Sequence, residues 1–172
     1  MQNLFSHPLN LEDMGSGVRT YRLSAEPNQL AYIAEVLKVD GVLNFTARLN
    51  VKFSRKAHRI DVDGVVEADV EQTSVISLEK FTKHYAPEFS MFFDTELTEK
   101  QLKEMSFDFD EEVPDIVEGG KIDLADIAME QLALVLDDFP RRDGEVFEFK
   151  SEFDEETTAK PNPFAVLSAL KK

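Results

Sequence analysis

The sequence predicts an α+β protein in which an antiparallel sheet, open or curled toward a barrel, packs on a buried helix in the C-terminal half. Apolar and polar residues alternate without interruption through 44–54 and again through 60–71, which is typical of strands with one face in water. The stretch from Lys121 to Arg141 is apolar on nearly every side, which is typical of a buried helix. A chain of 172 residues favours one main domain, which we place at 1–150.

Charge and composition narrow the possible functions. The net charge of −15 argues against indiscriminate binding to nucleic acid. The charges are unevenly distributed, however: residues 41–60 contain five basic residues and no acid, whereas 94–118 contain ten acids and two lysines. The absence of cysteine excludes disulfides and cysteine-ligated metals. No apolar run is long enough to span a bilayer, so we expect a cytoplasmic protein without a membrane partner.

The N-terminal third is expected to form a strand, a helix and then a long hairpin. The strand is predicted around Val18–Leu23, after an irregular arm. Pro27 suits the first position of an amphipathic helix over 27–38, in which Leu30 and Ile33 belong to the apolar face. The two alternating strands follow, joined by a turn at about 55–58.

The middle of the chain is less regular. Residues 73–81 are predicted to continue as a strand or a crossing segment, and 88–96 to form another strand. A short helix is predicted over 97–105, within an acidic surface excursion that covers 94–112. A possible edge strand is predicted at 146–149.

The buried helix has clear start and stop signals. Asp123 is the expected N-cap, and Pro140 closes the far end. We expect Leu124–Leu136 to be enclosed by the sheet, with a thin polar stripe that includes Glu130.

The C-terminal segment 151–172 is expected to be an acidic linker followed by a tail. In the tail, Asn162 can cap a short helix with Pro163 at its first position. We expect this helix either to dock on its own domain or to bind a partner. The candidate partner-binding residues are Lys160, Pro161, Asn162, Pro163, Phe164 and Leu167.

Candidate catalytic residues are absent. His7, His58 and His84 lack ligand spacing, and the common nucleotide-binding, hydrolase and zinc-protease motifs do not occur. Acid pairs such as Asp137 and Asp138 are common in so acidic a chain and favour solubility over catalysis. We therefore expect a non-enzymatic protein without metal or cofactor.

The hairpin turn is the expected place for contact with a polyanion. Basic residues line the first strand and acids the second, so one interpretation is an ion-paired ribbon in water. The other is an RNA-binding site, because phosphate affinity comes mainly from Lys and Arg. The candidate RNA-binding residues are Arg48, Lys52, Arg55, Lys56, His58 and Arg59.

Three segments resemble the YceD-type family of large ribosomal RNA subunit accumulation proteins. The tail KPNPFAVLSALKK, at 160–172, is similar to the C-terminal signature of that family. The stretch GGKIDLADIAMEQLALVLDDFPR resembles its G-x-I-D-L motif with the following apolar helix. The segment ADVEQTSVISLEKF, at 68–81, lies where the family has a strand leading to a turn that often contains C-x-x-C. Here Ser74 and Ser77 occupy those positions, so a cysteine-ligated zinc cannot form.

The resemblance implies a non-enzymatic role in the accumulation or assembly of large-subunit ribosomal RNA. The implied partners are a large-subunit ribosomal RNA precursor or ribosomal proteins. Two hypotheses follow: a factor that binds RNA through the basic turn, or an acidic module, centred on 94–118, that binds basic ribosomal proteins without touching RNA.

Overall fold

The structure is a computed structural model that describes residues 3–105 and 113–146. The chain divides into two units, Met1–Arg142 and Asp143–Lys172, and the fold below is that of the first. The predicted C-terminal helix and the candidate tail residues lie outside the described residues. In the described part, no helix combines the length and apolarity needed to cross a membrane.

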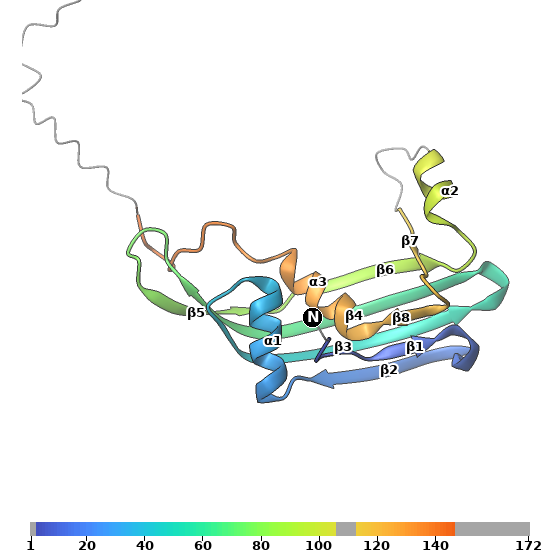
Figure 1. The fold of residues 1–172 in the computed structure, drawn as a ribbon, viewed down its shortest axis with the longest axis horizontal. Helices are drawn as coiled ribbons and strands as arrows, with labels where there is room; N and C mark the ends of the chain where they lie inside the picture. The colour runs from blue at the N-terminus through green and yellow to red at the C-terminus, as the bar shows by residue number, and fades with distance from the viewer. Residues whose placement is uncertain (1–2, 106–112, 147–172) are drawn as a thin grey trace, which may run out of the picture. The chain divides into compact units, whose positions relative to one another are not determined.

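A six-stranded sheet forms the framework of the first unit (Figure 1). Its strands are β2 (Gly17–Ser24), β3 (Gly41–Ser54), β4 (Arg59–Thr73), β5 (Lys80–Tyr85), β6 (Glu88–Asp94) and β7 (Asp115–Ile116). They follow the order β2-β3-β4-β6-β7, with β5 beside the distal part of β4. All pairs are antiparallel except β6 with β7. Within the described residues, β2 and β7 do not meet, so the sheet is open and not a closed barrel.

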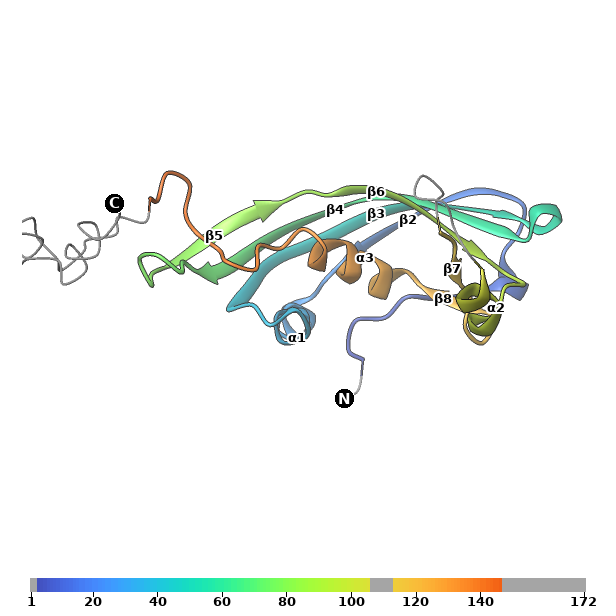
Figure 2. The ribbon, with the colours of Figure 1, turned by 90° about the horizontal axis from the view of Figure 1, so that it is seen from above.

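The predicted alternation of the hairpin strands is confirmed. Along β3, Phe45, Leu49 and Val51 are buried. Along β4, Val62 and Val66 on the same face are fully enclosed. The intervening residues face the opposite side, because successive side chains of a strand alternate between faces. Figure 2 shows α1 and α3 on one side of the sheet only. The opposite side, which we call the free face, carries the polar residues of both strands.

Helix α1 (Pro27–Leu37) matches the predicted N-terminal helix. Pro27 stands at its start, and the side chains of Glu26 and Gln29 form a reciprocal capping box. Ile33 and Ala34 are buried on its inner side. The helix therefore covers one end of the inner face of the sheet.

Helix α3 (Leu124–Ala133) is the buried helix, although it is shorter than predicted. Leu124, Ala128 and Leu132 are completely enclosed. The expectation that burial continues to Leu136 is wrong at Leu134 and Val135, which are 76% and 41% exposed. The chain leaves the helix at Ala133 and tightens into a turn, in which the amide of Val135 donates to the carbonyl oxygen of Leu132. The turn carries both side chains away from the sheet.

The N-terminal arm holds the start of α3. Strand β1 (Pro8–Asn10) pairs with β8 (Lys121–Asp123) in a separate two-stranded sheet, followed by the 3₁₀ turn η1 (Leu11–Asp13). Asp123 is the N-cap, as predicted: its Oδ1 accepts from the amide of Ala125 at 2.9 Å and from that of His7 at 2.8 Å. The Ser6 hydroxyl donates to its other oxygen. One carboxylate thus fixes both the helix and the arm.

The segment 73–81 does not continue as a strand. Residues 75–77 form a turn, and Leu78 directly after it has a left-handed backbone with φ of 59°. Strand β5 begins only at Lys80. The next strand and helix occur close to where they are predicted. They are β6 and α2 (Glu99–Glu104), and a capping box between Thr98 and Gln101 opens the helix.

Candidate nucleic-acid interface

The hairpin between β3 and β4 brings the candidate RNA-binding residues together at one end of the sheet. The 3₁₀ turn η2 (Arg55–Ala57) closes it, and His58 follows with φ of 51°. Arg55, Lys56, His58 and Arg59 therefore lie at the tip. Arg48 and Lys52 lie on the free face of β3, because they alternate with the buried Leu49 and Val51.

Two of the six candidates already have acidic partners. The Nε of Arg59 lies 2.5 Å from Oδ1 of Asp61, and its guanidinium lies 3.7 Å from the ring centroid of Phe92. The Nδ1 of His58 lies 3.0 Å from a carboxylate oxygen of Glu96. Arg59 and His58 are therefore committed to contacts within the fold.

Arg55 is partly committed. Its Nη2 donates to the carbonyl oxygen of Met14 at 3.4 Å, and its guanidinium lies 5.8 Å from the ring centroid of Phe53. A pocket of about 520 Å³ lies between this residue and the 14–16 segment, and Lys56 lines the same pocket. Arg55 thus connects the turn to the N-terminal arm.

Arg48, Lys52 and Lys56 are the unpaired cations of the hairpin. Each is exposed, and none of their side chains has a hydrogen-bond or ion-pair partner among the described residues. Lys52 lies opposite Asp61 in the register of β3 and β4, but Asp61 is bonded to Arg59 instead. The ion-paired ribbon is therefore not formed across these strands in the described part of the chain, and three cations remain available on the hairpin.

A fourth cation, Arg22, is missing from the sequence-based prediction. The register of β2 and β3 places it directly opposite Arg48 on the free face, where it is also exposed. The only signal in the sequence is the alternation of Arg22 with the buried Leu23. That signal gives the face of Arg22 but not the residue opposite it.

A group of carboxylates lies on the other side of the unit, beside α3. Asp115, Asp126 and Glu130 line a pocket whose walls include Met91 and Phe93. Burial raises the pKa of Glu130 above its ordinary value, and repulsion from Asp115 and Asp126 adds to this. Burial likewise raises the pKa of Asp126, with a further contribution from Asp123. A positive charge placed here would relieve that repulsion.

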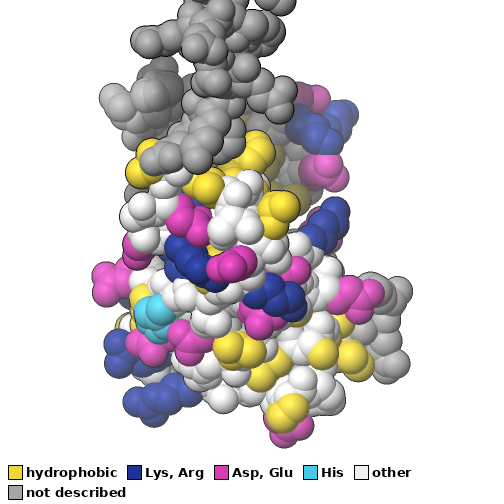
Figure 3. Space-filling view, turned by 90° about the vertical axis from the view of Figure 1, so that its left-hand side faces the viewer, with side chains coloured by type: hydrophobic (Ala, Val, Ile, Leu, Met, Phe, Trp, Pro, Cys, Tyr) yellow, Lys and Arg dark blue, Asp and Glu magenta, His cyan; other side chains and the backbone are white. Residues whose placement is uncertain are grey.

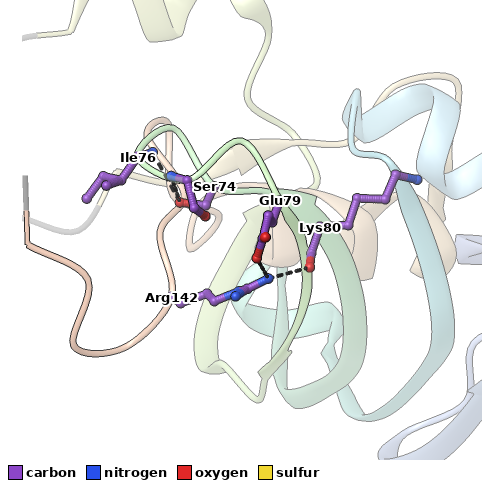
Figure 4. A network of polar contacts seen from close by, with 6 residues as sticks. Ser74, Ile76, Glu79, Lys80 and Arg142 are labelled. Atoms are coloured by element: carbon purple, nitrogen blue, oxygen red, sulfur yellow. Dashed lines mark hydrogen bonds and ion pairs between the residues drawn. The ribbon is translucent and has the colours of Figure 1, made fainter.

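The segment in which the resemblance places a C-x-x-C turn is held without cysteine (Figure 4). Ser74 is fully buried, and its hydroxyl oxygen accepts from the amides of Ile76 at 3.1 Å and Ser77 at 3.3 Å. Arg142 lies 2.8 Å from Glu79 and donates to the carbonyl oxygen of Lys80 at 3.1 Å. Hydrogen bonds and an ion pair therefore join this turn to the segment that follows α3.

Charges at the end of the unit that contains β5 are largely paired. Lys80 is bonded to Glu71, Lys83 to Asp137, and His84 to Asp69. Figure 3 looks onto this end and shows Lys and Arg side chains next to Asp and Glu. Unpaired cations are thus more typical of β2 and of the β3–β4 hairpin than of this end.

These features define an acidic α+β protein with an open antiparallel sheet, whose free face carries unpaired cations near one hairpin. The chain belongs to the family described as large ribosomal RNA subunit accumulation protein YceD, which matches residues 62–171. The match confirms the resemblance and includes the tail signature, whereas the turn and β3 precede the matched residues. No curated protein and no solved structure gives a significant match to the chain. Among the described residues, no three His, Cys, Asp or Glu side chains are grouped so that they could hold a metal ion.

Proposed function

We propose that this protein is a non-enzymatic factor in large-subunit ribosomal RNA accumulation, which binds precursor RNA transiently through the unpaired cations of the hairpin. The family to which the chain belongs supports the ribosomal role. The observation that supports the RNA contact is the exposure of Arg48, Lys52 and Lys56, which have no hydrogen-bond or ion-pair partner in the part of the chain that the structure describes. The net charge of −15 limits nonspecific adhesion to nucleic acid and makes the contact sensitive to salt.

The decisive experiment is co-sedimentation of tagged protein with large-subunit precursors. Lys52→Glu with Lys56→Glu should remove the protein from precursor fractions. The control is Lys38→Glu with Arg141→Glu, which makes the same change in net charge at exposed positions beside the opposite end of β4. If the hairpin variant sediments as the wild type does, the hairpin does not bind the RNA.

The second candidate function is an acidic module that binds basic ribosomal proteins without touching RNA. The carboxylates of Asp115, Asp126 and Glu130 support this alternative. Burial is the main cause of their raised pKa values, repulsion between carboxylates adds to it at Asp126 and Glu130, and a basic partner would lower that repulsion. It predicts that basic proteins remain bound after nuclease treatment. It also predicts that the hairpin variant retains them, whereas Asp126→Asn with Glu130→Gln does not.

Under both candidate functions, we propose that the tail binds a partner rather than docking on its own domain. Its candidate residues, which are 160–164 and Leu167, lie within the family match but outside the described residues. Deleting 160–172 should weaken association with precursors without changing the thermal midpoint of the first unit. A shortened protein that associates normally would remove the tail from the proposed function.

A further inference from the structure

Two arginines on neighbouring strands face each other on the free face of the sheet. The register of β2 and β3 pairs Arg22 directly with Arg48, and both side chains are exposed. Neither side chain has a hydrogen-bond or ion-pair partner within the described residues. Like charges directly opposite each other destabilise an antiparallel pair. Among the described residues, therefore, no carboxylate forms an ion pair with either arginine.

The surroundings of the two guanidiniums suit an oxyanion. On one side lies the cross-strand pair Ser24 and Thr46, and beyond Arg48 the next strand presents Val65 rather than an acid. A depression of about 350 Å³ is lined by both arginines together with Ser24, Thr46, Val65 and Glu67. Glu67 is the one carboxylate in this lining, and no ion pair joins it to either guanidinium among the described residues.

We propose that Arg22 and Arg48 together bind a phosphate group of an RNA backbone. A guanidinium presents a planar fork of donors that matches phosphate oxygens, and an anion between two guanidiniums removes their mutual repulsion. The hydroxyls of Ser24 and Thr46 supply further donors beside it. The inference rests on the proposed function and extends its RNA contact from the hairpin tip onto the sheet.

The geometry favours the RNA backbone over its bases. Phe92 is the one aromatic residue on the free face of β2, β3, β4 and β6, and the guanidinium of Arg59 already lies over its ring. No ring on these strands is therefore open for base stacking, on which base contacts with single strands depend. Contacts to phosphate position a nucleic acid without reading its sequence.

The site is continuous with the cations of the hairpin. Lys52 lies four residues beyond Arg48 on the same face of β3, a separation of about 13 Å along the strand. Lys56 follows at the turn. An RNA strand that follows β3 would thus meet Arg48, Lys52 and Lys56 in succession, with Arg22 beside the first.

The test measures the affinity of the full chain for a short labelled single-stranded RNA over a range of salt concentrations. Arg22→Gln and Arg48→Gln should each lower the affinity about fourfold at physiological salt and reduce the salt slope by about 0.7, as expected for one lost phosphate contact. Glu67→Gln should raise the affinity, because it removes the acid from the lining. Lys38→Gln is the matched control, at an exposed position beside the far end of β4, and should change neither quantity.

Arg22→Glu separates binding from folding. It replaces a repulsive cross-strand pair with an attractive one, so the thermal midpoint should rise while RNA affinity falls. If Arg22 acted only by stabilising the sheet, its replacement would lower the thermal midpoint and the RNA affinity together. A lower thermal midpoint for this variant would contradict the repulsion on which the inference rests.

Three results would overturn the assignment. If the two glutamine variants bind RNA as the wild type does while Lys52→Glu with Lys56→Glu does not, the proposed function stands and the Arg22–Arg48 site is wrong. If the wild type does not bind the RNA, both fail. If it binds vesicles of phosphatidylglycerol more tightly than RNA, and Arg22→Gln abolishes that binding, the site recognises a lipid headgroup instead.

Discussion

Gly64 and Arg48 lie so close across β3 and β4 that there is no room for a side chain between them. A Cβ atom at Gly64 would lie 3.0 Å from the carbonyl oxygen of Arg48 and 2.9 Å from the ring of Phe89. Contacts this short require the backbone or the ring to move. The absence of a side chain at Gly64 therefore allows β3 and β4 to approach closely beside Arg48, a candidate RNA-binding residue.

Gly64→Ala should lower the free energy of unfolding by about 1–3 kcal/mol, as overpacked core positions do. Gly41→Ala is the matched control on the same pair of strands, since its Cβ would meet Glu71 at an ordinary 3.5 Å. Urea unfolding of both variants provides the measurement. Equal stability of the two variants would show that the strands can separate at Gly64 without cost.

Asp123→Ala should lower the free energy of unfolding by about 1–3 kcal/mol. The change removes the N-cap of α3 and also the acceptor for the amide of His7. Asp123→Asn should lose less, because asparagine also caps helices well. Asp138→Ala, at an exposed position beyond the helix, serves as the control in the same unfolding measurement. An unchanged Asp123→Ala variant would mean that the arm does not depend on the cap.

Arg59→Ala should lower mainly the stability and Lys56→Ala mainly the RNA affinity, although the two residues are three positions apart. Arg59 is bonded to Asp61 and lies over Phe92, so its loss should cost about 0.5–2 kcal/mol in unfolding and leave RNA affinity nearly unchanged. Loss of Lys56 should change stability by less than about 0.5 kcal/mol and weaken RNA binding. A filter-binding assay beside thermal unfolding tests both. Equal losses of affinity would place Arg59 in the RNA contact.

Glu130→Gln should stabilise the protein at neutral pH but not in acid. Burial, followed by repulsion from Asp115 and Asp126, raises the pKa of Glu130 above the ordinary 4.5. The folded state then holds this proton to a higher pH than the unfolded chain does, so its contribution to stability falls as pH rises through that interval. The thermal midpoint of the variant should exceed that of the wild type at pH 7, and the difference should vanish below about pH 4. A difference independent of pH would contradict the cause assigned to the raised pKa.

Local patterns predicted the elements whose residues all obey one periodicity. The alternation through 44–54 gave the correct inner residues of β3, and Asp123 correctly marked the start of α3. Local patterns left 73–81 open as a strand or a crossing segment, because the interactions that hold the turn after Ser74 come in part from Arg142, far along the chain. An open sheet could not be distinguished from a curled one for a similar reason, since the strand order depends on contacts between distant segments.

The interface shows the same limit. Sequence reasoning gathered five basic residues and His58 at one hairpin, and the structure places them there. Which of them have partners depends on residues remote in the chain, such as Phe92 beside Arg59 and Glu96 beside His58. The pairing of Arg22 with Arg48 depends on the register of two strands separated by a helix. The charge pattern of the sequence predicted where the basic residues gather. Tertiary contacts decide which of them remain available to bind RNA.

The pairing of β1 with β8 delays completion of the fold during synthesis. Residues 8–10 leave the ribosome early, but their partners at 121–123 are translated more than a hundred residues later. Because α3 follows directly, its buried side chains also reach the sheet only then. The part of the hairpin's inner face that α3 covers should therefore stay uncovered until then, and chaperone demand should be greatest just before residue 124 emerges.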